Sequence, residues 1–421
     1  MNLKTMLLLS GAAAAGVIVM AAAVVLTGSE PMGPPDDAAA ALQPDPAAIG
    51  VIVTTHNGSY YTLTPSGELG YVSQPLLLPS GISSDGLWQA GIEWDEKEES
   101  AYLSVYYLVS DALDGKGSLL VHLPAALSVA EWAPQAALLV GLDESGALYL
   151  VDPGASETTL VAENVTAYAW ANGDRLIYAT QDNSGARLFG LDAARGPARE
   201  LASLAGPITE FHVSPERNQV VFAQDGSDGW RLLSLDPQTD VIKDYGSLGS
   251  ATRPVLEEAP EMAVAWSPSG RQFAVGPVSS PYVMYVVEAV GDWKGAYSTH
   301  AFEEGYAGEM TWSPDGTRLA ISTYSPDRTR HEVYVMDVSA RGGPRHLLDG
   351  CKIVWSPDGK FIAVKREPHN ANGVSAIRVA TGFNWLVAEQ PALVPLAWGR
   401  DEQDAMARSA EPLPYAVRLV K

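Results

Sequence analysis

The sequence predicts an all-β fold built from repeated four-stranded units. One hairpin pattern occurs three times, as AWSPSGRQFAVG from Ala265, TWSPDGTRLAIST from Thr311 and VWSPDGKFIAVK from Val354. Only 18% of the residues are charged, and 39 Gly, 29 Pro and 11 Trp favour strands and turns over helices. A repeat of about 43 residues with four strands is typical of one blade of a β-propeller. We therefore predict a β-propeller.

Eight positions in register define the repeat, and each ends a short apolar run. They are Trp94, Trp132, Trp170, Val213, Trp266, Trp312, Trp355 and Trp398. The spacings between them are 38, 38, 43, 53, 46, 43 and 43 residues. The longest spacing contains YGSLGSATRPVLEEAPE, which we interpret as an insertion.

The repeat that contains Trp312 illustrates the four strands that we predict for one blade. EMTW is the inner strand, SPDG a turn, RLAIST the second strand, EVYVMDV the third and PRHLL the fourth. Pro314 fits the fixed φ of a turn's second position, Asp315 can accept bonds from nearby amides, and Gly316 allows a positive φ. Pro357, Asp358 and Gly359 have the same roles one repeat later. Because no blade can bury both faces alone, we expect the tryptophans to pack between neighbouring blades.

These motifs resemble a known family. Trp266-Ser267-Pro268-Ser269-Gly270, Trp312-Ser313-Pro314-Asp315-Gly316 and Trp355-Ser356-Pro357-Asp358-Gly359 look like the repeats of TolB-type, WD-repeat-like β-propellers. Degenerate copies at Trp132, Trp170 and Val213 extend the resemblance over about residues 49–400, whereas at Trp94 and Trp398 it rests on spacing alone. It covers the propeller part of the family only, and it implies a fold without a catalytic site, since no G-x-S-x-G elbow is present.

The ends of the repeat region predict how the ring closes. The segment GVIVTTHNGSYYTLTPSGELGYVS supplies second, third and fourth strands, and LVPLAW near the C-terminus supplies the missing inner strand. Seven complete repeats and this composite blade give eight blades. The number falls to seven if the repeat at Trp94 is not a blade.

The N-terminus predicts the compartment. Met6 to Leu26 is a run of 21 uncharged residues, long enough to span a bilayer as a helix, and Lys4 precedes it. We expect a signal anchor over residues 1–27, a Pro/Ala/Asp-rich linker over 28–48 and the propeller over 49–421. This places a single-pass protein in the cell membrane with its propeller outside the cytoplasm, in the periplasm or the extracellular space. Cleavage after Ala21-Ala22-Ala23 and secretion is the alternative.

Composition excludes several classes of function. The 50 acidic and 27 basic residues give a net charge of −23, which opposes binding to nucleic acid and to anionic lipid, so the membrane is contacted only through the N-terminal helix. Cys351 is the only cysteine, and seven scattered histidines show no H-E-x-x-H spacing. We therefore predict no cofactor, no metal site and no enzymatic activity. In QDGSDGW, Asp225 and Asp228 favour a solvated hairpin loop over a calcium loop.

Acidic residues recur in the loops that join second to third strands and fourth to inner strands, and these loops share one end of a propeller. The candidate acidic binding face consists of Glu163, Asp182, Asp225, Asp228, Glu257, Glu303, Asp349 and Glu389. The loops of the opposite end carry Arg175, Arg217, Arg271, Arg318 and Lys360, among others. The alternative is that a chain of this net charge simply places its acids in loops.

The leading hypothesis is a membrane-anchored protein-interaction scaffold of the cell envelope whose partner is an envelope or secreted protein with a basic patch. A ligand- or cation-binding sensor or carrier that uses the mouth of the central channel is the second hypothesis. An unrecognised hydrolase or lyase with carboxylates at that mouth is the third.

Overall fold

The structure is a computed structural model of the 421-residue chain. The chain divides into two units, Met1–Pro44 and Asp45–Lys421. The residues that the structure describes lie between 50 and 400, with gaps that include 72–82, 108–117, 248–261 and 290–297. The predicted anchor and linker lie outside them. In the part that is described, no helix is long and apolar enough to cross a membrane.

The described residues form an all-β fold, and their strands pair antiparallel. One sheet joins both ends of the second unit, in the order β30 (Val394–Gly399), β1 (Val51–His56), β2 (Ser59–Leu63) and β3 (Leu69–Tyr71). Within it Ile52 lies opposite Trp398, so the N-terminal strands and the C-terminal strand share a sheet, as predicted.

The other sheets follow in chain order. A three-stranded sheet contains β4 (Trp88–Asp95), β5 (Ser100–Tyr107) and β6 (Ser118–Leu123). Four sheets of four strands come next: β7 (Leu127–Trp132), β8 (Leu139–Asp143), β9 (Leu148–Asp152) and β10 (Glu157–Ala162); β11 (Val165–Ala171), β12 (Arg175–Asp182), β13 (Gly185–Asp192) and β14 (Arg199–Leu204); β15 (His212–Val213), β16 (Val220–Gly226), β17 (Gly229–Asp236) and β18 (Val241–Ser247); β19 (Met262–Trp266), β20 (Gln272–Pro277), β21 (Tyr282–Glu288) and β22 (Ser298–Phe302). A seven-stranded sheet contains β23 (Tyr306–Trp312), β24 (Arg318–Tyr324), β25 (His331–Asp337), β26 (Arg345–Trp355), β27 (Phe361–Arg366), β28 (Gly373–Arg378) and β29 (Asn384–Ala388).

Two repeats differ from the predicted four-stranded pattern. The repeat that contains Trp94 forms three strands among the described residues, because only residues 124–126 separate β6 from β7. The predicted fourth strand PRHLL continues without interruption into the next inner strand as β26. Residues 345–349 of β26 pair with β25, and residues 350–355 pair with β27, so one strand serves two neighbouring repeats.

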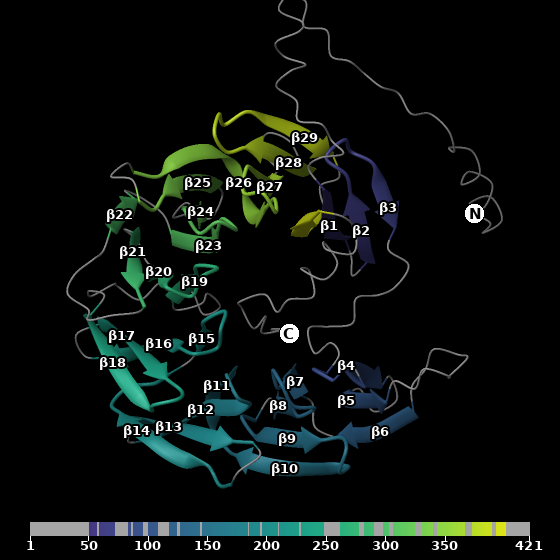
Figure 1. Ribbon diagram of the computed structural model, residues 1–421, viewed down its shortest axis with the longest axis vertical. Helices are drawn as coiled ribbons and strands as arrows, with labels where there is room; N and C mark the ends of the chain where they lie inside the picture. The colour runs from purple at the N-terminus through teal and green to yellow at the C-terminus, as the bar shows by residue number, and fades with distance from the viewer. Residues whose placement is uncertain are drawn as a thin grey trace, which may run out of the picture. The chain divides into compact units, whose positions relative to one another are not determined.

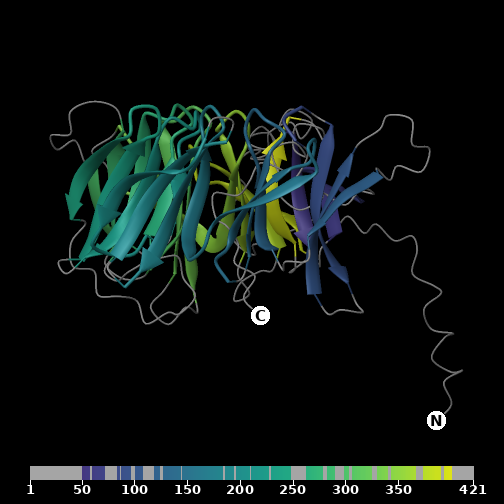
Figure 2. The ribbon, with the colours of Figure 1, turned by 90° about the horizontal axis from the view of Figure 1, so that it is seen from below.

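The sheets follow one another around a ring in Figure 1, and their strands run between two ends where the turns gather in Figure 2. Of seven buried apolar clusters among the described residues, six lie between one sheet and the next, and the seventh lies between the two halves of the seven-stranded sheet. In one of them Trp312 packs with Ala265 and Met284 of the preceding sheet. In another Phe361 packs with Ile52 of the closing sheet. The core of this unit therefore lies between sheets, as stacking of repeats requires.

The motif tryptophans also hydrogen-bond between repeats. The indole Nε1 of Trp170, Trp266, Trp312 and Trp355 donates to a backbone oxygen of the repeat before it. The acceptors are Glu131 (3.1 Å), His212 (3.2 Å), Ala265 (2.9 Å) and Thr311 (3.1 Å). Each acceptor directly precedes the motif position of its own repeat. Trp132, Trp170, Trp312, Trp355 and Trp398 are buried, Trp266 is half-buried, and the side chain of Trp94 lies outside the described set.

The S-P-x-G turns contact one another around one end of the ring. In the turn at Pro314, Gly316 N donates to Ser313 O at 2.8 Å and Gly316 has a φ of 69°. A Cβ on Gly316 would lie 3.8 Å from Pro268, and one on Gly359 would lie 3.6 Å from Pro314. Each turn glycine therefore faces the proline of the preceding turn.

Candidate functional site

The second-to-third and fourth-to-inner connections lie at the same end of the ring. Gln181 at the end of β12 donates its backbone N–H to the carbonyl of Asn164, which precedes β11, at 3.0 Å. In a later repeat, Glu332 of β25 lies directly opposite Asp349 of β26. The strands run between two ends of the ring (Figure 2), and both kinds of connection lie at one of these ends, where we predict the binding face.

The structure places some of the predicted acidic face and leaves the rest outside the described residues. Glu163, Asp182, Asp349 and Glu389 are exposed. Asp182 pairs with Arg187 at 3.2 Å. Asp225 lies in β16 opposite Trp230. Asp228, Glu257 and Glu303 lie outside the described residues.

Asp349 requires a correction. Its expected place is a loop, but it lies in β26, where it is paired with β25. The reason is that β26 needs no loop, because Gly350 allows the strand to pass directly from one sheet to the next. A Cβ on Gly350 would lie 2.6 Å from Lys365 O, so no other residue fits this crossing without a shift.

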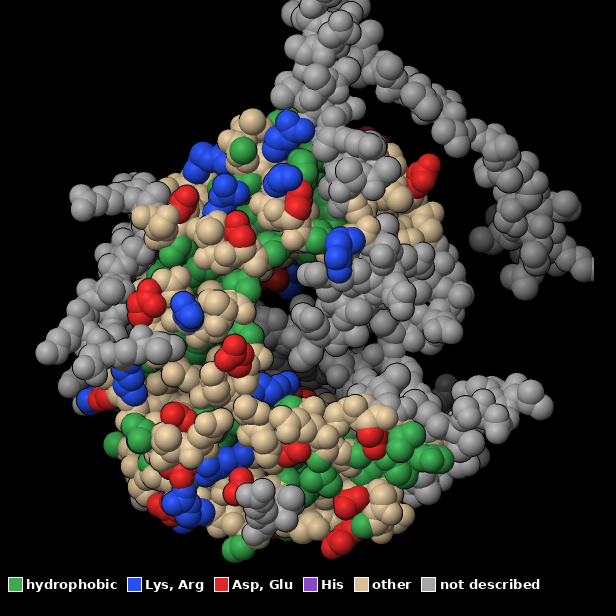
Figure 3. All heavy atoms as spheres, viewed as in Figure 1, with side chains coloured by type: hydrophobic (Ala, Val, Ile, Leu, Met, Phe, Trp, Pro, Cys, Tyr) green, Lys and Arg blue, Asp and Glu red, His purple; other side chains and the backbone are tan. Residues whose placement is uncertain are grey.

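Two arginines expected at the opposite end connect repeats to one another. Arg217 donates from Nη1 to Trp170 O at 2.8 Å and pairs with Glu131 at 3.3 Å. Arg175 donates to Pro237 O and pairs with Asp240 at 2.6 Å. On the face shown in Figure 3, acidic and basic side chains are interspersed. These two arginines thus have structural partners in neighbouring repeats.

The partly buried carboxylate of Glu131 lies beside Arg217. Burial raises the pKa of Glu131 above its ordinary value, and the charge of Arg217 opposes this rise. Burial likewise raises the pKa of Tyr168, and the negative charge of Glu131 adds to the effect. Within the described residues the Tyr168 hydroxyl has no hydrogen-bond partner. Glu131, Trp170 and Arg217 belong to three consecutive repeats, so the bonds of Arg217 join all three.

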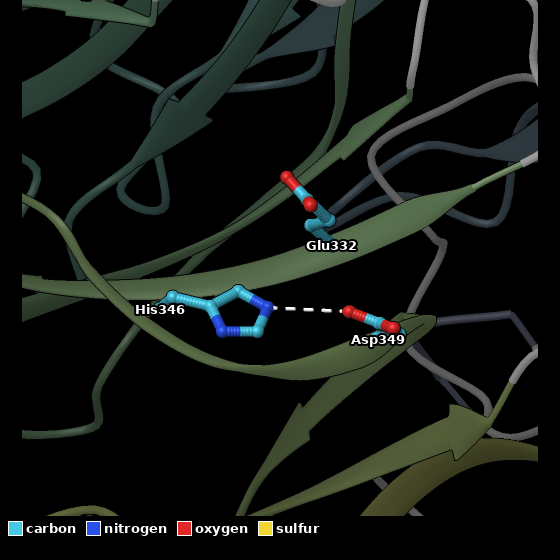
Figure 4. A group of neighbouring side chains, drawn as sticks. All are labelled: Glu332, His346 and Asp349. Atoms are coloured by element: carbon cyan, nitrogen blue, oxygen red, sulfur yellow. Dashed lines mark ion pairs between the residues drawn. The ribbon is translucent and has the colours of Figure 1, made fainter. Parts of the chain in front are cut away.

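Glu332, His346 and Asp349 form a cluster on β25 and β26 (Figure 4). One potential ligand atom from each residue lies within 4.8 Å of the other two. His346 Nε2 lies 3.3 Å from Asp349 Oδ1. Glu332 is partly buried, and the other two side chains are about half exposed, at 46% and 49%. Among the described residues, no other group of three such side chains comes together in this way.

A β-bulge brings these side chains to one face of the sheet. Tyr334 pairs with His346 and Val333 pairs with Leu348, so Leu347 is an extra residue in β26. Without the extra residue, positions three apart would point to opposite faces. With it, His346 and Asp349 share a face.

Tyr334 supports the cluster. Its hydroxyl donates to Glu332 Oε2 at 2.7 Å, and its ring meets the ring of His346 edge-on at 5.3 Å. Burial, together with this bond and the charges of Glu332 and Asp349, raises the pKa of Tyr334 to about 12. The phenol therefore stays protonated and holds the Glu332 carboxylate in place.

No family model and no curated protein matches the chain. Among solved structures, dipeptidyl peptidase 4 of Porphyromonas gingivalis is similar with a TM-score of 0.54 at 11% identity, over 86% of this chain and 62% of that one. The chain folds as a β-propeller. TolB from Acinetobacter baumannii matches over 81% of this chain and 92% of that one (TM-score 0.34, 14% identity), and the Dos1 propeller over 74% and 83% (TM-score 0.47, 14% identity).

The sequence pattern of this propeller indicates Asp349 as a site residue but not Glu332 or His346. His346 is one of seven histidines without a metal-binding spacing. The signal that could have found the cluster is the hairpin of HEVYVMD with RHLLDG, which brings Glu332 opposite Asp349. The bulge at Leu347 is not visible in the sequence pattern, and without it His346 is assigned to the wrong face.

Proposed function

We propose that this β-propeller is a membrane-anchored protein-interaction scaffold of the cell envelope, with its ring outside the cytoplasm and no catalytic role. The exposure of Glu163, Asp182 and Glu389 at one end of the ring carries the proposal. Like charges at one end add their fields and attract the basic patch of a partner, which raises the association rate. The hydrogen-bonded contacts between repeats provide a rigid support for such a surface.

We propose an eight-bladed ring. This number takes the β4–β6 sheet as a three-stranded blade and divides the seven-stranded sheet at Gly350 into two blades that share β26. The sheet of β30, β1, β2 and β3 closes the ring.

Charge reversal tests the binding face. Glu163, Asp182 and Glu389 are changed together to lysine, and the control is the change of Arg271, Arg318 and Lys360, which follow the turns of the opposite end, to glutamate. Proteins captured from envelope extract by the wild type should be lost with the first variant and kept with the second, and their capture should weaken steeply with salt. Equal capture by both variants contradicts the proposal, because the acidity would then serve solubility alone.

Fractionation tests the anchor. The uncharged run of residues 6–26 should keep the full chain with membranes after a high-salt wash, whereas a chain that starts at Pro44 should be soluble and folded. Mature protein that begins near Val24 would show instead that the segment is a cleaved signal.

A further inference from the structure

We propose that Glu332, His346 and Asp349 form a binding site for a divalent transition-metal ion such as zinc on the outer part of one blade. This site goes beyond the scaffold role and is independent of it. Three observations support the proposal. They are the short distances between the donor atoms, the strand register and bulge that place the three side chains on one face, and the contacts of Tyr334 with Glu332 and His346.

The donor atoms already lie close to the positions that a metal ion needs. Zinc binds nitrogen and oxygen ligands at about 2.0–2.2 Å, so the ligands of one ion lie about 3–4 Å from each other. The three atoms lie within 4.8 Å of one another, and His346 Nε2 lies 3.3 Å from Asp349 Oδ1. Small side-chain rotations therefore suffice to place all three around one ion.

Without a cation this arrangement carries an energetic cost. Glu332 and Asp349 are directly opposite in the strand register, and like charges in such pairs destabilise a sheet. The bulge at Leu347 adds the imidazole of His346 to the same face. A bound divalent ion would turn the repulsion between the two carboxylates into attraction to a shared centre.

Tyr334 contacts two of the three proposed ligands, Glu332 and His346. Its hydroxyl donates to Glu332 Oε2 at 2.7 Å, and its ring lies against His346. Such contacts orient metal ligands, and their loss typically reduces metal affinity about 10–100-fold. One neighbour thus holds two of the three ligands.

The donor set selects the class of ion. An imidazole nitrogen with two carboxylate oxygens suits zinc and its neighbours among the transition metals, whereas calcium and magnesium prefer oxygen ligands alone. Three protein ligands on a half-exposed surface leave at least one coordination position for water or for a group of a partner.

Another blade provides a matched control. Glu157 of β10 lies directly opposite Asp152 of β9, so this pair also has two facing carboxylates. Glu157 is exposed, and Asp152 accepts the backbone N–H of Ala155 at 3.0 Å. No histidine completes a group of three there among the described residues.

The experiment titrates Zn²⁺ into the full-length chain by calorimetry. We expect Glu332→Gln, His346→Gln and Asp349→Asn each to lower the affinity for Zn²⁺ at least about tenfold, and Tyr334→Phe to lower it about tenfold. Glu157→Gln should leave it unchanged. With Co²⁺ as a probe, the wild type should show a visible absorption band that His346→Gln loses.

Two outcomes overturn the proposal: a wild-type chain that binds no Zn²⁺, or equal affinities in the wild type, His346→Gln and Asp349→Asn. Thermal unfolding without metal checks that each variant folds. Since all three ligand side chains retain solvent exposure and the two carboxylates repel each other, their replacement should not lower the unfolding midpoint, and a variant that unfolds early is set aside in favour of the other two.

Discussion

At Gly316 the backbone adopts a φ of 69°, a conformation that disfavours any residue with a Cβ. The space around it is open, since a Cβ would first meet Pro268 at 3.8 Å, so the penalty comes from the backbone itself. We expect Gly316→Val to lower the free energy of unfolding by about 1–3 kcal/mol in urea titrations. Gly343, which has no positive φ and open space around it, is the control, and Gly343→Val should cost little. Equal costs would contradict the turn assignment.

Asp315 in the same turn makes stability depend on acid. A hydrogen bond from Ser313 Oγ holds the pKa of Asp315 below its ordinary value of 3.8, helped by the N–H and hydroxyl of Thr317. A carboxyl whose pKa is lower in the folded state contributes stability above its unfolded pKa and loses it as the pH falls through the folded pKa. Asp315→Asn should therefore lower the unfolding midpoint near neutral pH and flatten its decline below about pH 4.

The next turn allows this prediction to be repeated. Burial opposes ionisation of Asp358, but bonds from Lys360 N and Ser356 Oγ together lower its pKa. Urea unfolding of Asp315→Asn with Asp358→Asn should show a flatter acid dependence than either single variant. An unchanged slope in the double variant would show that these carboxylates do not contribute.

The sequence predicts residues whose contacts are local in the chain better than residues that are brought together by strand pairing. The turn residues Pro314, Asp315 and Gly316 follow from local rules, because their bonds lie within four or five positions of the chain. The cluster of Glu332, His346 and Asp349 depends on a cross-strand register and on a bulge. Local periodicity contains neither the register nor the bulge, so the sequence indicates only Asp349 among the three residues.

Among the strands, too, some features can be predicted from the local sequence and others cannot. The motif tryptophans and the strand order within a repeat follow from the hydrophobic pattern and the spacing. The continuity of β26 does not, because PRHLL and CKIVW read as separate strands with a loop between them. Gly350 removes the side chain that would otherwise collide with Lys365 O, so the two strands merge.

Trp312 shows how one repeat is held to the next. Its indole is buried between β19–β22 and β23–β26, and its Nε1 donates to Ala265 O at 2.9 Å. We expect Trp312→Ala to cost about 3–5 kcal/mol because it leaves a cavity. Trp312→Phe should cost about 1 kcal/mol, chiefly for the lost hydrogen bond. Phe383→Ala, a change at an exposed aromatic residue, is the control for chemical denaturation, and a cost as large as that of Trp312→Ala would contradict this role.

At the scale of the whole molecule, the sequence predicts closure because the N-terminal segment lacks an inner strand and the C-terminal segment supplies one. In the structure β30 near the C-terminus pairs with β1 near the N-terminus and supplies this inner strand. The blade number is harder to derive, since the repeat at Trp94 has lost its motif and the insertion before Trp266 obscures the period. Closure depends on two complementary strands, whereas counting needs every copy to be recognisable.

A disulfide tests the closure directly. Val53 of β1 lies opposite Ala397 of β30, and both are buried. Facing Cα atoms in antiparallel strands are about 4.5–5.5 Å apart, a separation that a disulfide spans. In a Cys351→Ala background, Val53→Cys with Ala397→Cys should form an intramolecular disulfide on oxidation and stabilise the ring by about 2–4 kcal/mol relative to the reduced form. Val53→Cys alone in the same background is the control and should show no such redox dependence. If both thiols of the double variant stay free under oxidation, the two ends of the chain do not share a sheet in solution, and the ring is open at this point.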